Sequence, residues 1–345
     1  MLKKKWLPLV LTLSLAALAG CGQTESATGS QGGGTSEAPE AKTYKVAVSQ
    51  IVEHPSLDAT REGFIAALKD AGIVEGENLT LDYNNAQGDS TNNLSIAQKL
   101  AGSKNDLVLA IATPSAQAVA AQVKETPVLF AAVTDPVSAK IVASMEKPGA
   151  NISGASDTNP EAIKQLADFI AEEMPDIKSV GLVLNEGEPN AVVMADRAEQ
   201  EFGAHGIKLV KAAATNTSEV QQAAQSLVGQ VDALYITLDN TVVSAVDTII
   251  KIANDNKLPF FSSDRDTVEK GAFATVGFKY YDHGYQVGEM AADILKNGTK
   301  PADLPVAMQE KLDLILNLKA AEAQGITVTD GMKGKVQDQE NNLIQ

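Results

Sequence analysis

Polar and acidic side chains recur in this sequence just beyond short apolar runs, where a folded chain can hold a small molecule. In the first half of the chain they are Ser49, Gln50, His54, Thr113, Ser115, Thr134 and Asp135. In the second half they are Asn185, Asn190, Thr237, Asp239, Asp264 and Tyr280. Hydroxyl groups and free helix amides can receive a carboxylate, whereas a desolvated ammonium group needs a carboxylate partner. The set therefore offers partners for both ends of a small charged ligand.

Helix capping is the structural alternative for many of these residues, because Ser, Thr, Asp and Asn satisfy free amides at helix starts. The residues that capping alone could explain are Ser56, Asp58, Ser115 and Asn190. Asp135, Asp239 and Asp264 form a separate group, since each follows a predicted strand whose end would face one cleft. We expect at least one of these three aspartates to bind the ammonium group of a ligand.

Motifs of enzymes and metal sites are missing from the sequence. It contains no Gly-x-Ser-x-Gly, no Gly-x-x-x-x-Gly-Lys and no His-Glu-x-x-His. His54, His205 and His283 are scattered, and Cys21 is the only cysteine, so their spacing does not suit a metal ion. His205 is expected at a helix end facing solvent, whereas His54 follows a strand and is expected to contact the ligand. We therefore predict no cofactor, no metal and no enzymatic activity.

Short β-branched apolar runs alternate with longer amphipathic stretches, which is typical of parallel βαβ units. The expected strands are residues 44–48, 79–83, 107–112, 128–133, 152–155, 180–184, 207–212, 233–236, 260–262, 272–276 and 311–318. The expected helices are residues 58–71, 92–101, 115–123, 137–145, 160–173, 191–202, 218–229, 242–254, 281–296 and 320–324. Ligands bind beyond the carboxyl ends of parallel strands, so the polar side chains should meet at one cleft.

The two halves of the folded part resemble each other. Residues 45–73 and residues 179–207 have the same length, and both end in Gly-Ile. The fold class predicted is therefore α/β, with two similar doubly wound parallel-sheet lobes joined by a hinge. We expect lobe I to contain residues 43–157 plus 281–303 and lobe II residues 158–280 plus 304–333. Residues 334–345 are expected to fray.

The start of the sequence is typical of a lipoprotein export signal. Three lysines precede the apolar residues 6–19, which are too few to span a bilayer, and Leu18-Ala19-Gly20-Cys21 follows. We expect residues 1–20 to be removed, Cys21 to carry fatty-acid chains such as palmitate, and the Gly- and Ser-rich residues 21–42 to form a flexible tether. The alternative is a cysteine buried in an N-terminal helix. Localisation is predicted at the extracytoplasmic face of the cell membrane.

The net charge bears on the binding partners of the protein, and the chain length bears on its number of domains. The formal net charge is −16, which disfavours nucleic acid as a partner and suits an exported protein that must stay soluble. About 300 residues follow the tether, a length usual for two packed domains.

Three stretches of the sequence resemble the tryptophan/tyrosine uptake family of ABC transporter substrate-binding lipoproteins: residues 81–89 (LDYNNAQGD), 112–118 (ATPSAQA) and 132–137 (AVTDPV). The similarity extends over residues 44–318. It implies a type I periplasmic-binding fold whose chain crosses a hinge near residues 156–159, 279–282 and 302–306. It also implies a monomeric solute-binding lipoprotein that closes on tryptophan, tyrosine or phenylalanine and delivers it to an ABC permease and its ATPase.

On this hypothesis, Thr113 and Ser115 hold the ligand carboxylate, Asp239 or Asp264 holds the ammonium group, and His54 and Tyr280 line the side-chain pocket. Two alternatives stay open. The same fold could bind a nucleoside, a branched amino acid or a signal molecule read by a membrane sensor. A surface-anchored α/β enzyme could instead use Glu186, Glu188 or Asp264 as catalytic carboxylates.

Overall fold

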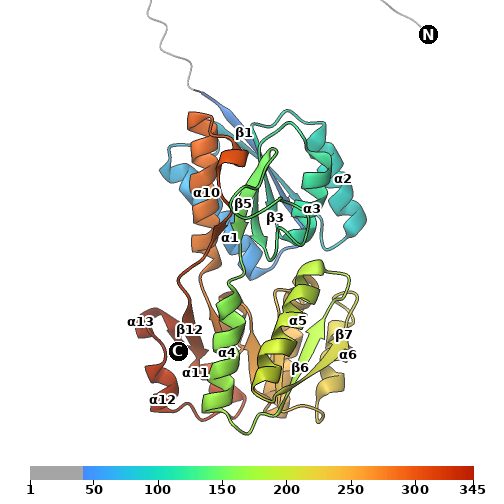
Figure 1. Cartoon of the computed structure of the whole chain (residues 1–345), viewed down its shortest axis with the longest axis vertical. Coiled ribbons are helices and arrows are strands. Elements are labelled where there is room, and N and C mark those ends of the chain that lie inside the picture. The colour runs from blue at the N-terminus through green and yellow to red at the C-terminus, as the bar shows by residue number, and fades with distance from the viewer. Residues whose placement is uncertain (1–41) are drawn as a thin grey trace, which may run out of the picture. The chain divides into compact units, whose positions relative to one another are not determined.

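The computed structural model describes residues 42–345, which fold into two α/β lobes, each built on its own sheet (Figure 1). The export signal, Cys21 and nearly all of the tether predicted above lie outside the described residues. Within residues 42–345, no helix has both the length and the apolar character that a membrane crossing requires. The two-lobed α/β fold predicted from the sequence is confirmed.

Lobe I has a six-stranded sheet in the order β11-β5-β4-β3-β1-β2, and all its strand pairs are parallel. Its strands are β1 (Tyr44–Gln50), β2 (Leu79–Asn85), β3 (Leu107–Ile111), β4 (Val128–Val133), β5 (Ile152–Ser156) and β11 (Ala307–Met308). Its helices are α1 (Pro55–Asp70), α2 (Ser90–Ala101), α3 (Thr113–Gln122) and α10 (Tyr280–Asn297), with the short 3₁₀ helix η1 (Pro301–Asp303). Val46 and Val48 of β1 pack in the core beneath α1 and α10, whereas Ala47 packs in the core beneath α2 and α3. Strand residues alternate between faces, so both faces of this sheet are buried.

Lobe II has a seven-stranded sheet in the order β13-β12-β10-β9-β8-β6-β7. Its strands are β6 (Ser179–Leu184), β7 (Lys208–Ala213), β8 (Ala233–Ile236), β9 (Phe260–Ser262), β10 (Ala274–Gly277), β12 (Asp313–Asn317) and β13 (Leu343–Ile344). Its helices are α4 (Pro160–Glu173), α5 (Pro189–Ala204), α6 (Val220–Leu227), α7 (Asn240–Ser244), α8 (Val246–Asn256), α9 (Arg265–Lys270), α11 (Leu318–Ala323), α12 (Asp330–Gly334) and α13 (Gln339–Asn342). The order β7-β6-β8-β9-β10 repeats the order β2-β1-β3-β4-β5 of lobe I, so the two lobes share one topology.

Several predicted elements differ in the structure. Residues 137–145 form turns in place of the expected helix, because Asp135 accepts bonds from the amides of Val137 and Ser138 and Lys140 takes a left-handed φ of 59°. The helix expected over residues 242–254 is two helices, α7 and α8, that meet at Ala245. Strand β12 pairs antiparallel with β10, and the short helix α9 was not predicted.

The chain passes between the lobes three times. It leaves lobe I after β5 through residues 157–159, returns after β10 through residues 278–279, and leaves again after β11 through residues 309–312. The third crossing was expected at residues 302–306, but Ala307 and Met308 still pair with β5 in lobe I. Gln309 begins the third crossing and connects it to the first, since its carbonyl accepts from Asn159 Nδ2 at 3.1 Å. Its side-chain Nε2 donates to Gln286 Oε1 of α10 at 2.8 Å.

Helices α1 and α10 approach each other closely through glycines. A Cβ atom on Gly284 of α10 would lie 1.9 Å from the carbonyl oxygen of Thr60 in α1, and one on Gly63 of α1 would lie 2.0 Å from the carbonyl oxygen of Tyr281. Real Cβ atoms do not make such contacts, so only glycine allows this spacing. The position of α1 is therefore set by α10, which begins at the second hinge crossing.

The C-terminal residues are ordered, contrary to the expectation that residues 334–345 fray. Leu343 and Ile344 of β13 pair with β12, and Asn342 is buried. The Asn342 amide donates to Asp313 Oδ2 at 2.6 Å, and its oxygen accepts from the guanidinium of the buried Arg265. The tail is fixed because it supplies further hydrogen bonds to two buried charged groups, Arg265 and Asp313.

Asn342→Ala is therefore expected to lower the free energy of unfolding by about 2 kcal/mol, since it removes hydrogen bonds to two buried charges. Urea denaturation followed by circular dichroism measures the change. Asn297→Ala is the matched control, because Asn297 bonds an exposed aspartate on the outer end of α10 and should change the stability by less than about 0.5 kcal/mol. Equal effects of the two variants would show that the tail does not stabilise lobe II.

Candidate functional site

A small cavity lies between the lobes, where the carboxyl ends of both sheets meet. Lobe I contributes His54, Ser56, Leu57, Ala132 and Thr134 to its lining, lobe II contributes Asn190, Leu238, Asn240, Val243 and Asp264, and the hinge side contributes Asp157 and Tyr280. We call it the interlobe cavity. Its volume is about 20 Å³, which accommodates a water molecule. A larger ligand therefore has to enter while the lobes stand further apart.

The lobe I wall of the cavity is the start of α1. Pro55 occupies the first turn, and His54, at the N-cap position, makes no side-chain hydrogen bond to the helix amides. Ser56 and Leu57 of the first turn line the cavity. A helix start without a side-chain cap presents free N–H groups and the positive end of the helix dipole, which together favour an anion.

The lobe II wall carries the carboxylate of Asp264, whose side chain is almost completely buried. Asp264 is the N-cap of α9: its Oδ1 accepts from the Thr267 amide at 2.7 Å and from Ser56 Oγ of the opposite lobe at 3.1 Å. Its Oδ2 accepts from Ser262 Oγ at 3.0 Å. Beside it, burial and the Asp264 charge raise the pKa of Asp266 to about 7. The Ser56–Asp264 bond joins the lobes directly.

A second carboxylate, that of Asp157, enters the cavity from the first hinge crossing. Asp157 is buried, and its Oδ2 accepts from the Tyr280 hydroxyl, next to the second crossing, at 3.0 Å. Burial raises the pKa of Asp157 to about 6, although the Tyr280 hydrogen bond acts in the opposite direction. No lysine or arginine is among the residues that line the cavity. Two carboxylates without a basic partner favour a cationic group.

Two further acceptors complete the lining. The amide nitrogen of Asn190 donates to Glu188 Oε2 at 3.0 Å and to the Leu238 carbonyl at 2.8 Å, which leaves the buried Asn190 Oδ1 without a partner. His54 Nε2 lies 3.5 Å from Asn240 Oδ1, and its buried Nδ1 also lacks a partner. Burial lowers the pKa of His54, so the ring is neutral and its free nitrogen can accept a hydrogen bond.

Glu188 is the residue that orients these amides. Its two carboxylate oxygens accept from the backbone amides of Asn240 and Thr241, from the Asn240 side chain and from the Thr241 hydroxyl, at 2.6–3.0 Å. Together with the bond from Asn190, these contacts occupy the carboxylate fully. Glu188 therefore positions other side chains and is not free to act as a catalytic group.

The structure brings five of the residues predicted from the sequence to the interlobe cavity: His54, Thr134, Asn190, Asp264 and Tyr280. The other eight do not line it: Ser49, Gln50, Thr113, Ser115, Asp135, Asn185, Thr237 and Asp239. Ser49 and Thr237 are fully buried, each with a hydroxyl oxygen that lacks a partner, and Asn185 bonds Thr241.

The remaining predicted residues have structural partners of their own. Gln50 is fully buried and bonds Asp58 and Arg61 of α1. Thr113 Oγ1 accepts from the Thr134 amide at 3.4 Å, and Ser115 donates to Asn93 at 3.1 Å. Asp135 caps the turn after β4, as described above.

Asp239 is the N-cap of α7, and its carboxylate bonds the amides of Val242 and Asn185. Burial, with Glu188 nearby, raises the pKa of Asp239 well above its usual value. Asp135 is thus explained as a turn cap and Asp239 as a helix cap, whereas Asp264 both caps a helix and lines the cavity.

Sequence reasoning missed Ser56, Asp157 and Asn240 as lining residues, although all three follow strands in the same way as the residues that it selected. It explained Ser56 as a possible helix cap, but the Ser56 hydroxyl bonds Asp264. It placed residue 157 at the end of lobe I, in the first hinge crossing. The apolar members Leu57, Leu238 and Val243 carry no signal that separates them from ordinary core residues.

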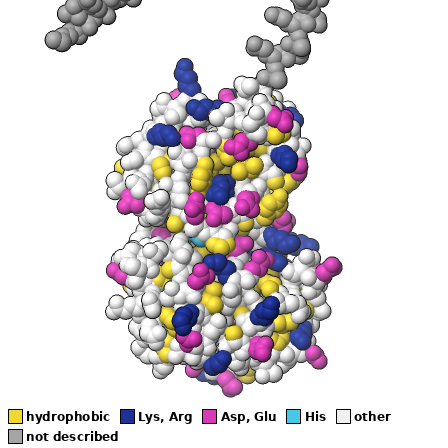
Figure 2. All heavy atoms as spheres, turned by 180° about the vertical axis from the view of Figure 1, so that it is seen from behind, with side chains coloured by type: hydrophobic (Ala, Val, Ile, Leu, Met, Phe, Trp, Pro, Cys, Tyr) yellow, Lys and Arg dark blue, Asp and Glu magenta, His cyan; other side chains and the backbone are white. Residues whose placement is uncertain are grey.

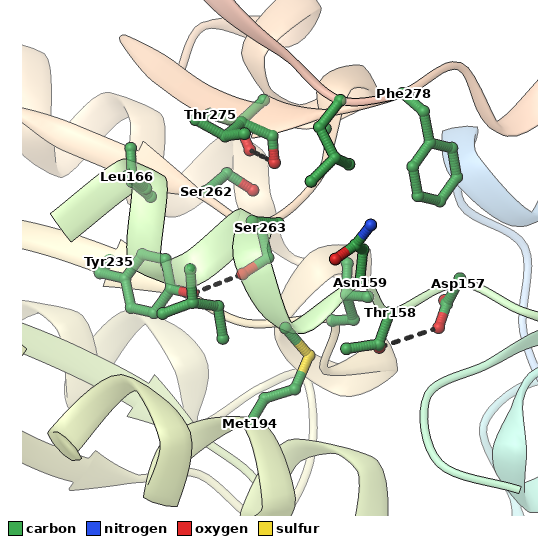
Figure 3. Close-up of a pocket in the computed structure, with 16 residues that line it drawn as sticks. Asp157, Thr158, Asn159, Leu166, Met194, Tyr235, Ser262, Ser263, Thr275 and Phe278 are labelled. Atoms are coloured by element: carbon green, nitrogen blue, oxygen red, sulfur yellow. Dashed lines mark hydrogen bonds between the residues drawn. The ribbon is translucent and has the colours of Figure 1, made fainter. Parts of the chain in front are cut away.

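A second cavity, also of about 20 Å³, lies in lobe II beside the hinge (Figure 3). We call it the hinge cavity. Asp157 and Leu238 line both cavities, so the two are adjacent. Most of its wall is apolar, with Ile163 and Leu166 of α4, Met194 of α5 and Phe278 of the second crossing among its members.

On the rear face of the molecule, basic and acidic side chains are interspersed with scattered apolar ones (Figure 2).

Comparisons with known proteins agree on one family. A family model described as ABC transporter substrate binding protein matches residues 45–338. The chain is 38% identical over 330 residues to a tyrosine-binding protein of Clostridioides difficile (strain R20291), covering 94% of each chain. Among solved structures, an ABC domain from Streptococcus pneumonia in complex with L-Trp is 31% identical with a TM-score of 0.81, covering 86% of this chain and 99% of that one.

A third relative allows the arrangement of the lobes to be compared with an open structure. The ligand-free, open structure of the substrate-binding protein CD0873 from Clostridium difficile is 39% identical, with coverage of 88% and 98%, yet its TM-score is only 0.64. The complex with L-Trp is less similar in sequence and more similar in shape. With Ser56 bonded to Asp264 across the lobes, this structure has the closed arrangement.

Proposed function

The chain belongs to the ABC transporter substrate-binding protein family, and from that premise we propose that it captures an aromatic L-amino acid and delivers it to a membrane permease and its ATPase. The tyrosine-binding relative and the relative solved with L-Trp support an aromatic ligand. The protein acts as a binder and not as an enzyme. Glu188, one of the carboxylates that an enzyme would need, is occupied by structural hydrogen bonds.

The observation that carries this proposal is the lining of the interlobe cavity, where Asp157 and Asp264 face a helix start and no basic side chain. An α-amino acid has one cationic and one anionic group attached to the same carbon atom. Its ammonium group would bond Asp264, Asp157 and the free oxygen of Asn190, and its carboxylate would bond the first-turn amides of α1. The carboxylate site is thus proposed at α1 and not at Thr113 and Ser115 in α3.

This arrangement explains why the lobes close. The carboxylate partners belong to lobe I, whereas Asp264 and Asn190 belong to lobe II. A ligand that satisfies both sets interacts more strongly with the closed form than with the open form, and so shifts the population toward closure.

Calorimetric titration tests the proposed function. Residues 42–345, which correspond to the whole of the solved relatives, are unfolded, freed of copurified ligand, refolded and titrated with tyrosine, tryptophan, phenylalanine, leucine and a panel of nucleosides. We expect a dissociation constant of about 1 μM for at least one aromatic amino acid, which corresponds to roughly −8.2 kcal/mol. Tighter binding of leucine or a nucleoside would contradict the aromatic ligand. Chemical conversion of a ligand, followed by mass spectrometry, would contradict a pure binding role.

The affinity is expected to fall at acidic pH because of Asp157. Its carboxyl, with a pKa of about 6, is ionised at pH 7.5 and protonated at pH 5, where it loses its attraction for the ligand ammonium group. The dissociation constant should therefore rise about ten-fold between pH 7.5 and pH 5. Asp157→Asn should bind weakly at both pH values and lose most of this dependence. A wild-type affinity that is constant over this range would exclude Asp157 as an ammonium partner.

We also propose that Cys21 carries the lipid anchor and that the protein faces the outside of the membrane. The basic start, the short apolar run and the small residues before Cys21 support this. Cys21→Ala should abolish labelling by radioactive palmitate and release the protein from the membrane fraction. Unchanged membrane association and labelling would refute the anchor.

A further inference from the structure

We infer that the hinge cavity is the subsite for the ligand's aromatic ring and that the hydroxyl groups of Tyr235 and Ser263 make it prefer a phenol. This inference rests on the proposed function, because it takes the head group of the amino acid to be held in the interlobe cavity. It adds the location of the ring and the residues that determine specificity.

The first argument is the position of the two cavities. Asp157 and Leu238 line both, so an ammonium group at Asp157 has the hinge cavity within reach of its own side chain. The Leu238 side chain is half-buried and stands between them on the short loop from β8 to α7. The two spaces hold about 20 Å³ each, so a ring would have to enter while the lobes stand further apart. The walls of the hinge cavity come from α4, α5 and three strands of lobe II and from the hinge crossings. An occupant would therefore contact both the body of lobe II and the segments that bend during closure.

The second argument is the chemistry of the walls. Ile163 and Val276 contribute aliphatic groups to the lining. Leu166, Met194 and Phe278, which is at the second crossing, contribute aliphatic, thioether and aromatic groups (Figure 3). The only ionisable carboxyl in the lining is Asp157, at the border with the interlobe cavity. Thr158, Asn159, Ser262 and Thr275 also line the cavity, but its largely apolar and sulfur-containing wall favours a neutral ring over a charged side chain.

The third argument is the hydroxyl pair that lines this cavity. Tyr235 OH and Ser263 Oγ lie 2.5 Å apart and share one hydrogen bond. Two hydroxyl groups have two protons, and their mutual bond uses only one. The other proton and the remaining lone pairs are available, so a phenol on the ligand can both donate to the pair and accept from it. A ligand without that hydroxyl leaves these groups without a partner, which lowers its affinity.

The test compares tyrosine with phenylalanine by calorimetry. Wild-type protein is expected to bind tyrosine about ten-fold more tightly than phenylalanine, as one well-placed neutral hydrogen bond allows. Ser263→Ala and Tyr235→Phe should each remove most of this difference by weakening tyrosine and should change phenylalanine by no more than about two-fold. Tyr285→Phe is the matched control, because Tyr285 bonds Asp70 on the outer surface of lobe I and should preserve the wild-type preference.

A third variant tests the location independently of hydrogen bonding. Ala162 of α4 lines the hinge cavity and not the interlobe cavity, and Ala162→Phe would fill the space with a ring. Binding of all three aromatic amino acids should fall more than about 30-fold, and a thermal melt checks that the variant is still folded, since the added ring exceeds the present cavity of about 20 Å³.

The outcomes separate this inference from the proposed function. Normal aromatic binding by Ala162→Phe, or an unchanged preference in both hydroxyl variants, would overturn the subsite and leave the proposed function intact. Failure of the wild-type protein to bind any aromatic amino acid would overturn both. Should Ala162→Phe prove unfolded, the two hydroxyl variants decide the matter.

Discussion

Asp264→Asn is expected to weaken the binding of an aromatic amino acid on the order of 100-fold, because a buried ammonium group would lose its charged partner. The substitution removes a charge and little else. Asparagine is as good a helix N-cap as aspartate, so the start of α9 and the bond from the Thr267 amide should survive. Titration at pH 7.5, with a thermal melt of each sample, measures the effect separately from folding.

Asp135→Asn is the control for that experiment. Asp135 has the same position after a strand and also bonds backbone amides, but it lies outside the cavity lining. Its substitution should leave the affinity within about two-fold of wild type. If Asp264→Asn behaved like Asp135→Asn, then Asp264 would be only a helix cap, and the proposed site for the ammonium group would be wrong.

Gly284→Ala is expected to lower the free energy of unfolding by about 3 kcal/mol. The new Cβ atom would meet the Thr60 carbonyl oxygen at 1.9 Å, so α10 and α1 would have to separate. Alanine is the better helix former by about 1 kcal/mol, but this gain is smaller than the loss of close packing along both helices. Urea denaturation measures the net effect.

Gly203→Ala provides the opposite expectation from the same chemical change. Gly203 lies near the end of α5, and a Cβ atom there would have no neighbour within 4 Å. The substitution should therefore raise the stability by about 0.5–1 kcal/mol. Similar effects at the two glycines would show that helix propensity, and not the contact between α1 and α10, determines the outcome.

The fold could be predicted because its signals are local. The apolar strands of lobe I, such as residues 128–133, are buried on both faces and are bounded by turn residues. The repeated length of the units 45–73 and 179–207 predicted two lobes, and both sheets have the same strand order. The element that failed, the expected helix over residues 137–145, depends on the capped turn at Asp135, which periodicity does not reveal.

The site could be predicted only in part, because its membership depends on how the lobes meet. Asp239 and Asp264 look alike in the sequence: both follow a strand, and both cap a short helix. They differ because Asp264 meets Ser56 of the other lobe, whereas Asp239 bonds Asn185 within lobe II. The distance between residues 56 and 264 along the chain leaves no local trace of that contact.

The order of the C-terminal residues 334–345 also depends on distant contacts that the local sequence does not reveal. Residues 334–345 are polar and follow the last predicted helix, so the sequence suggested a loose end. Their order comes from Arg265 and Asp313, which are buried and need partners. A polar segment can thus be held firmly when it supplies hydrogen bonds to charges elsewhere in the fold.

The acidic lining of the interlobe cavity also has a consequence for the ATP that a transporter consumes. When the lobes close, Asp157 and Asp264 come to line one enclosed space with no lysine or arginine among the other lining residues. Two anions in such a space disfavour closure unless a cation accompanies them. On the proposed function, a cationic group of the ligand would therefore favour closure. A transporter that responds to the closed form would seldom meet an empty receptor, and its ATP hydrolysis would be protected from futile cycles.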